Sequence, residues 1–143
     1  MTVYEELLLI EERDGTLKPE AVVKYAKNKK TALHSKFNWD DSSAAEHWRL
    51  EQARGIIRVT VTVLPNQDMP VRAFVSLRDD RNVNIGYRNI TSVLSDEELR
   101  RQLLNDALSE MQVFKRKYAQ LKELESVFMA MEEIAMSTEL VSA

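Results

Sequence analysis

Residues 37–48 read FNWDDSSAAEHW and place aromatic rings, two adjacent aspartates, two serines, a glutamate and a histidine within a dozen positions. A reactive site here would use His34, Asp40, Asp41 and His47 as metal ligands, or His47 with an aspartate as base and acid. The two histidines are thirteen residues apart, and no H-x-x-x-H or H-x-x-E pairing is present. Because this spacing matches no metal motif, we predict no metal site and no catalytic residue.

The same stretch is better explained as the start of a helix. One of the two aspartates precedes the helix, whose positive end favours a carboxylate. Residues 43–46 have the form of a capping box, in which a serine and a glutamate satisfy free backbone N–H groups. Phe37 and Trp39 are expected in the core, and His47 and Glu51 form an exposed pair one turn apart.

Composition narrows the class of protein. The 143 residues fit one domain of ordinary size, and 44% hydrophobic with 30% charged residues is typical of a globular chain. The absence of cysteine excludes disulfides and thiolate catalysis. The glycines at 15, 55 and 86 are isolated, so no glycine-rich phosphate loop exists and no cofactor is expected. No secretion signal or membrane-length apolar run is seen, which predicts a cytosolic protein without membrane contact.

Hydrophobic periodicity predicts an α+β, mainly α, fold. Helices are expected over 4–13, with Gly15 as a left-handed stop, over 19–28, with Pro19 at its first position, and over 43–54, closed by Gly55. IIRVTVTVL and VRAFVSL alternate around the turn PNQDMP, which predicts a β-hairpin of strands 57–64 and 71–77. Residues 78–90 are polar and turn-like. Residues 1–90 would form a helical head with this hairpin, and residues 91–143 a long amphipathic helix.

The C-terminal third predicts self-association. Ser95 is the expected N-cap and Glu98 its partner. Apolar residues then recur at spacings of three and four, with one extra three-residue step from Leu121 to Leu124: Leu104, Ala107, Met111, Phe114, Tyr118, Leu121, Leu124 and Phe128. The predicted oligomerisation residues are Leu104, Met111, Phe114, Tyr118, Leu121 and Phe128. About 40 helical residues would span roughly 60 Å, more than a globule of this size can cover. We expect a homo-oligomer, a dimer in the first place, unless the helix breaks near Lys122-Glu123 and folds back.

Charge is distributed unevenly although the net charge is only −3. Residues 18–36 contain six lysines and a single acid. Three helices followed by a hairpin is also the order of elements in a winged helix-turn-helix protein, so we predict nucleic-acid contact, with DNA or RNA as the partner. The phosphate-contacting residues would be Lys24, Lys27, Lys29, Lys30 and Lys36, with Arg58 and Arg72 as secondary candidates. The competing interpretation is a solvated lysine-rich face, since no Arg/Asn/Gln set is clearly placed to read bases.

A resemblance covers nearly the whole chain, from about Leu7 to Phe128. The stretches LKPEAVVKYAK, ALHSKFNWDDSSAAEHWRLEQARGII, VRAFVSL, GYRNI and VLSDEELRRQLLNDAL occur in this order. Together they resemble a family of small uncharacterised proteins encoded by bacteriophages and prophages. The resemblance implies a phage setting and expression in the cytoplasm of a bacterial host, and it supplies no activity and no catalytic residues.

The sequence therefore predicts a non-enzymatic, phage-type protein that oligomerises through its C-terminal helix and contacts nucleic acid through its basic head, in a regulatory or DNA-binding role. The alternative is a protein-interaction or assembly module without nucleic-acid binding, either a virion component or an inhibitor of a host protein. An enzyme that uses His47 and the aspartates ranks third.

Overall fold

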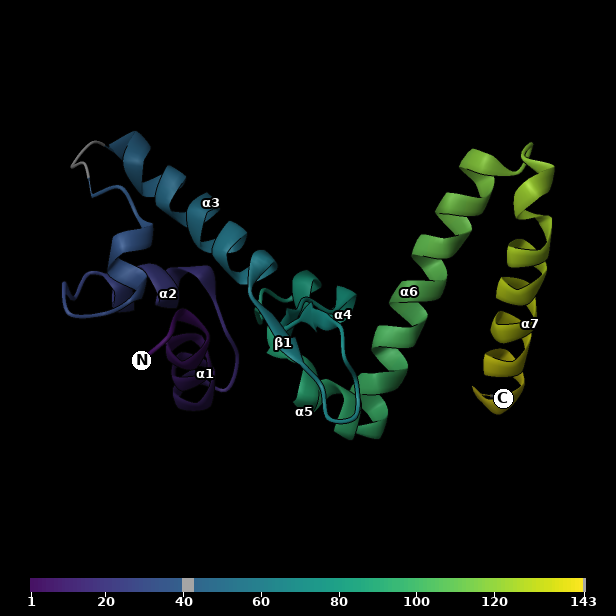
Figure 1. Cartoon of the computed structure of the whole chain (residues 1–143), viewed down its shortest axis with the longest axis horizontal. Helices are drawn as coiled ribbons and strands as arrows, with labels where there is room; N and C mark the ends of the chain where they lie inside the picture. Colours follow the sequence, from purple (N-terminus) through teal and green to yellow (C-terminus); the bar gives the residue numbers. More distant parts are fainter. Residues whose placement is uncertain (40–42, 143) are drawn as a thin grey trace.

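The chain forms an N-terminal helical head, a small strand region in the middle, and a helical hairpin at the opposite end (Figure 1). The computed structural model describes residues 1–39 and 43–142. Its elements are α1 (Val3–Asp14), α2 (Pro19–Ala26), η1 (Leu33–Lys36), α3 (Ser43–Val59), β1 (Val61–Val63), β2 (Pro70–Arg72), β3 (Phe74–Val75), α4 (Arg78–Asn82), β4 (Arg88–Asn89), α5 (Ile90–Ser95), α6 (Glu97–Tyr118), η2 (Lys122–Leu124) and α7 (Glu125–Ser142). With 67% helix and two small antiparallel sheets, the predicted α+β, mainly α, class is confirmed.

The first two helices begin and end where local chemistry places them. The side chain of Thr2 accepts a hydrogen bond from the Glu5 N–H at 3.2 Å, and Glu5 accepts one from the Thr2 N–H at 2.7 Å, so α1 starts with a capping box. Gly15 ends α1 at φ 84°, a conformation that favours glycine. Pro19 is the first residue of α2, where its missing N–H is no loss. The stop at Gly15 and the start at Pro19 confirm the prediction, whereas α2 ends at Ala26, two residues earlier than expected.

The core of the head is apolar and joins α1, α2, α3 and β3. Residues with at most 1% of their surface exposed include Leu7, Ile10, Leu17, Val22, Ala26, Leu33, Ala53, Ile57, Ala73 and Phe74. Glu6 is a charged residue that is also buried, at 3% exposure. Its carboxylate accepts hydrogen bonds from the backbone N–H groups of Ala32 and Leu33 at 2.8 and 2.9 Å. This buried contact holds the lysine-bearing segment 27–36 against α1.

Helix α3 differs from its prediction. It continues through Gly55 to Val59, so the strand predicted over 57–64 shrinks to Val61–Val63. The helical register buries Ile57 completely in the core, whereas Val59 stays 75% exposed. The free energy gained by burying Ile57 outweighs the strand preference of the alternating sequence. It also outweighs the cost of about 1 kcal/mol for a glycine within a helix. Gly55 is therefore not a stop.

Replacing Gly55 by alanine is expected to raise the free energy of unfolding by about 0.5–1 kcal/mol, because alanine loses less backbone entropy in a helix. Nothing lies within 4 Å of an ideal Cβ at this position. Urea denaturation measures the change. Gly86→Ala serves as the opposite case, since φ is 110° there and the added Cβ would lie 2.6 Å from the Leu17 carbonyl oxygen. Destabilisation by Gly55→Ala would contradict the helical position of residue 55.

The predicted hairpin is split between two sheets. β1 pairs antiparallel with β2, with Val61 opposite Arg72 and Val63 opposite Pro70. The predicted strand 71–77 breaks after Arg72, and its second part, β3, pairs instead with β4. β4 and α4 lie within residues 78–90, which the sequence predicted as a polar turn. A structured segment forms there because Asp80, only 4% exposed, binds the Arg88 guanidinium through both carboxylate oxygens, at 2.6 and 3.1 Å.

Burial raises the pKa of the Glu11 carboxyl on α1, although a hydrogen bond from Asn89 on β4 lowers it. Within the described part of the chain, the second oxygen, Oε2, is buried without a hydrogen-bond partner. The folded chain holds this proton more tightly than the unfolded chain. Glu11 therefore contributes stability at low pH that is lost as pH rises from the unfolded towards the folded pKa.

Replacing Glu11 by glutamine is expected to remove this loss of stability with rising pH. The difference in unfolding free energy, variant minus wild type, should grow in favour of the variant as pH rises above about 4, the ordinary pKa of a glutamate. Urea denaturation at a series of pH values from this point upward measures it. Glu20→Gln, at an exposed glutamate on α2, is the matched control. If the two variants follow the same pH dependence, burial of Glu11 is not its cause.

The C-terminal third begins one residue later than predicted and turns back on itself. Ser95 ends α5, and Asp96 is the N-cap of α6, accepting a hydrogen bond from the Leu99 N–H at 2.9 Å. The predicted continuous helix is interrupted by η2 at Lys122–Leu124, and α7 returns beside α6 (Figure 1). The alternative in which the helix breaks near Lys122-Glu123 is the observed one. Within the described ranges, no helix has the length and apolar character to cross a membrane.

Candidate nucleic-acid and self-association surfaces

The aromatic residues at the start of FNWDDSSAAEHW are structural. Phe37 is 8% exposed and belongs to the core, and Trp39 packs against it with ring centroids 5.5 Å apart. The Trp39 indole N–H donates to the His34 carbonyl at 2.8 Å, and the two rings stack at 4.9 Å. The guanidinium of Arg49 lies over the Trp39 ring, 5.4 Å from the ring centroid. The prediction that Phe37 and Trp39 anchor the core is confirmed.

The polar residues of that stretch do not assemble into a described reactive site. Nδ1 of His34 lies 2.8 Å from the Ala26 carbonyl oxygen, while His47 is exposed on α3. Asp40, Asp41 and the side chain of Ser43, the predicted cap, lie outside the described residues. Glu51 pairs with Arg54. Among the residues that are described, no three His, Asp or Glu side chains form a group that could hold a metal ion.

Five exposed lysines form a surface at the outer end of the head, which we call the lysine surface: Lys24, Lys27, Lys29, Lys30 and Lys36. They follow one another from α2 through the loop to the end of η1, at the end of the molecule remote from α6 and α7 (Figure 1). Lys24 and Lys27 border a depression of about 770 Å³ between α2 and α3. Glu20 and Glu46 border the same depression, so its charge is mixed.

The two arginines predicted with these lysines lie elsewhere. Arg58 is in the last turn of α3, roughly 17 Å along that helix from His47, and Arg72 is on β2. The structure thus divides the predicted nucleic-acid-binding set into the lysine surface and a second group near α6. In addition, α2 and α3 are joined by residues 27–42, a much longer connection than the three- or four-residue turn of a helix-turn-helix.

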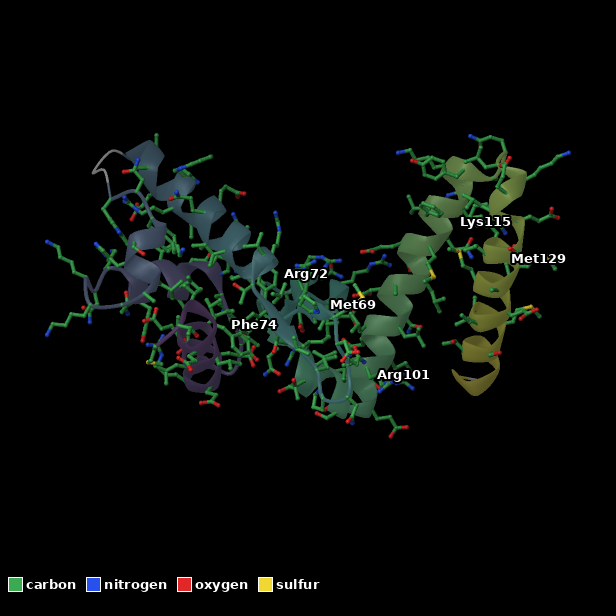
Figure 2. The ribbon with its side chains drawn as sticks, viewed as in Figure 1. Met69, Arg72, Phe74, Arg101, Lys115 and Met129 are labelled. Atoms are coloured by element: carbon green, nitrogen blue, oxygen red, sulfur yellow. The ribbon has the colours of Figure 1, made fainter. Side chains whose placement is uncertain are left out.

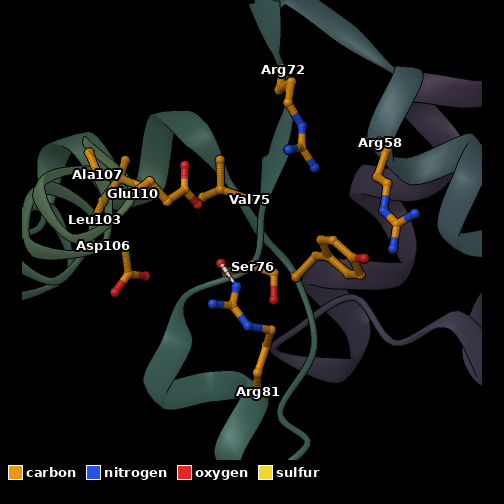
Figure 3. A pocket seen from close by; sticks show the side chains of 10 residues that line it. Arg58, Arg72, Val75, Ser76, Arg81, Leu103, Asp106, Ala107 and Glu110 are labelled. Atoms are coloured by element: carbon orange, nitrogen blue, oxygen red, sulfur yellow. Dashed lines mark hydrogen bonds between the residues drawn. The ribbon is translucent and has the colours of Figure 1, made fainter. Parts of the chain in front are cut away.

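Arg58 and Arg72 meet Arg81 around a cavity of about 330 Å³, which we call the arginine pocket (Figure 3). Arg81, on α4, donates to the Ser76 carbonyl at 2.7 Å. The opposite wall comes from α6, with the carboxylates of Asp106 and Glu110. Sequence reasoning missed Arg81, because no local pattern connects residue 81 with residues 58 and 72.

Contacts between α6 and α7 use part of the predicted oligomerisation stripe. Phe128 is 6% exposed and meets Phe114 edge to face at 6.1 Å, and Phe114 lies 4.9 Å from Tyr118. Lys115 forms an ion pair with Glu132 between the helices (Figure 2). Met111 and Tyr118 are half-buried. Fold-back therefore covers the middle of the stripe.

Much of the apolar surface of this hairpin stays uncovered. Leu104, Phe114 and Leu121 of the predicted set are 41–42% exposed, and α6 contains no buried residue. Four further residues of α7 are 45–63% exposed: Val127, Met129, Ile134 and Met136. Val127 and Ile134, seven residues apart, form a stripe on one side of the helix. Met129 and Met136, also seven residues apart, form a stripe on the other side. Sequence reasoning missed them, although VFMAMEEIAM is apolar on several faces, a pattern typical of a helix covered on more than one side.

The two helices also leave space between them away from the turn. One depression of about 680 Å³ has Leu104 and Arg100 on its α6 wall and Ile134 on its α7 wall. Another, of about 420 Å³, lies between Leu108 on α6 and Ala135 on α7. Figure 1 shows the helices separating towards the C-terminus.

No protein-family model, curated protein or solved structure matches this chain. The resemblance to phage and prophage proteins therefore stays a prediction. Function is inferred below from the charge, exposure and contacts of the described residues.

Proposed function

We propose that this protein is a non-enzymatic assembly protein that binds a second copy of itself through the α6–α7 hairpin, in the phage or prophage setting that the resemblance implies. One observation carries this proposal: a helical hairpin with apolar residues on several faces has only Phe128 buried among its described residues. Apolar side chains concentrated in this way on one element are typical of a surface that another chain covers.

Charge favours a second copy as the partner. The sequence of α7 contains four glutamates and no lysine or arginine. The α6 wall of the space between α6 and α7 has Arg100 and Arg101 against one acid, Glu97, and so carries net positive charge. The α7 helix of a second copy would therefore bring both apolar stripes and charge of the opposite sign into this space. Reciprocal insertion of this kind would form a four-helix bundle, the usual way in which such stripes are buried.

Sedimentation at micromolar concentration tests the proposal. The wild-type chain is expected to sediment as a dimer, and Val127→Glu/Ile134→Glu as a folded monomer, with the dissociation constant raised at least about 100-fold. Ser126→Glu places a new charge next to position 127 on the polar side of α7 and is expected to leave the dimer intact. A wild-type monomer, or equal dissociation of the dimer by the single Val127→Glu and Ser126→Glu variants, would overturn the proposal.

Nucleic-acid contact through the lysine surface is the second candidate function. Its specific support is five exposed lysines within thirteen residues, held in place by the buried contact between Glu6 and the 27–36 segment. Lysines that replace counterions around phosphates produce binding that weakens steeply with salt.

A gel-shift assay at low salt tests this candidate. Lys24→Glu/Lys27→Glu is expected to abolish retention of DNA or RNA, and Lys122→Glu, at the far end of the molecule, to preserve it. If the wild-type chain retains neither nucleic acid, the lysine surface is only a solvated face. If reversing the lysine charges has no effect on function while the dimer-breaking variant abolishes it, the protein is an assembly module alone.

A further inference from the structure

We infer that the arginine pocket binds the phosphate group of a nucleotide unit. Arg58, Arg72 and Arg81 point into one cavity from three different elements, α3, β2 and α4 (Figure 3). Guanidinium groups present paired N–H donors that match the oxygens of phosphate, so three of them around one space form a strong site for a dianion.

These arginines differ from four others in their pairing. Arg13, Arg54, Arg88 and Arg101 each have a carboxylate partner. Within residues 1–39 and 43–142, Arg58, Arg72 and Arg81 have none, although Asp106 and Glu110 border the same cavity. The lining carries these three guanidinium groups against two carboxylates, a net charge of +1. A phosphate bound between the guanidinium groups gains charge-assisted hydrogen bonds.

The walls of the pocket are held in place before any ligand binds. Antiparallel pairing with Val61 fixes the backbone of Arg72, and the hydrogen bond to the Ser76 carbonyl orients Arg81. Tyr87, on the floor, is fixed by two backbone hydrogen bonds with Leu17, at 2.8 and 2.7 Å. A pre-ordered site of this kind loses less conformational entropy when it binds a ligand.

The α6 wall indicates what the phosphate carries. Asp106 and Glu110 supply carboxylates opposite the three arginines, and one oxygen of Asp106 already accepts the Arg78 N–H at 2.8 Å. Carboxylates accept hydrogen bonds from hydroxyl and amino groups. A nucleotide unit carries such groups on its sugar and base, at a distance from the phosphate, whereas inorganic phosphate has no sugar or base. The cavity volume of about 330 Å³ also exceeds what phosphate alone would fill. Free nucleotides and nucleic-acid strands share this chemistry.

Thermal unfolding with three probes tests the inference: inorganic phosphate, adenosine 5′-monophosphate and a short single-stranded oligothymidylate. The nucleotide is expected to raise the melting temperature of the wild-type chain with concentration, as mass action requires. Arg58→Gln and Arg72→Gln should each weaken this effect at least about tenfold, the loss expected for one charge-assisted contact. Arg116→Gln, an exposed arginine elsewhere on α6, should not.

The probes distinguish the two sources of phosphate. If the oligothymidylate binds more tightly than adenosine 5′-monophosphate and with a steep salt dependence, the ligand is a nucleic-acid strand. If the two bind with equal affinity, the ligand is a free nucleotide. Glu110→Gln should weaken the binding of the nucleotide but not the binding of inorganic phosphate. If no probe stabilises the wild-type chain, or if the pocket variants respond as Arg116→Gln does, the inference is wrong. Sedimentation of Arg72→Gln, expected to be unchanged, separates this result from a failure of self-association.

Discussion

Replacing Phe74 by alanine is expected to lower the free energy of unfolding by about 3–5 kcal/mol. Phe74 is the largest fully buried side chain, and its ring centroid lies 6.1 Å from that of Tyr4 on α1. Removing the ring loses its transfer free energy and leaves a cavity that the packed helices cannot fill. Because a domain of this size is stable by about 5–15 kcal/mol, the variant should be close to unfolding at room temperature.

Urea denaturation followed by circular dichroism measures this change. Phe74→Leu, which keeps most of the volume, is expected to cost clearly less, about 1–2 kcal/mol. Val83→Ala removes an apolar group that is 65% exposed and should change the stability by less than about 0.5 kcal/mol. A loss below about 1 kcal/mol for Phe74→Ala would mean that the head core does not support the fold as described.

Replacing Asp80 by asparagine is expected to cost about 2–4 kcal/mol. The substitution keeps the shape of the side chain but removes the charge that faces Arg88, whose side chain is 26% exposed. The hydrogen bonds that Arg88 donates to Asp80 raise the pKa of its guanidinium. Arg88 stays charged even without this partner, because an arginine side chain is not deprotonated in proteins. An unpaired, partly buried cation then opposes the pairing of β4 with β3.

A double-mutant cycle separates the pair from its surroundings. Arg88→Met in the Asp80→Asn background is expected to recover part of the lost stability, since it removes the unpaired charge. Glu98→Gln, which breaks the exposed pair with Arg101, should cost less than about 1 kcal/mol in the same assay. Equal effects of Asp80→Asn and Glu98→Gln would show that burial adds nothing to the Asp80–Arg88 pair.

Asp80 also shows why the site could be predicted only in part. Residues 78–90 have the composition of a turn, and nothing in RDDRNVNIGYRNI distinguishes a buried aspartate from a solvated one. Arg81 comes from the same segment and completes the arginine pocket, which Arg58 and Arg72 alone did not indicate. Such convergence depends on how distant elements pack, and local periodicity carries no information about it.

The sequence by itself determined the features that rest on local chemistry: Pro19 and Gly15 at helix ends, the aromatic anchors Phe37 and Trp39, and the helical class of the chain. Only the tertiary structure decided that α3 passes through Gly55, that Asp80 is buried, and that α7 returns beside α6. Caps and turns depend on residues that are neighbours in the sequence. Each cap contributes about 1 kcal/mol, and its residues can be recognised from the sequence alone. Burial of Ile57 or Phe128 depends on partners far away in sequence and outweighs those local preferences.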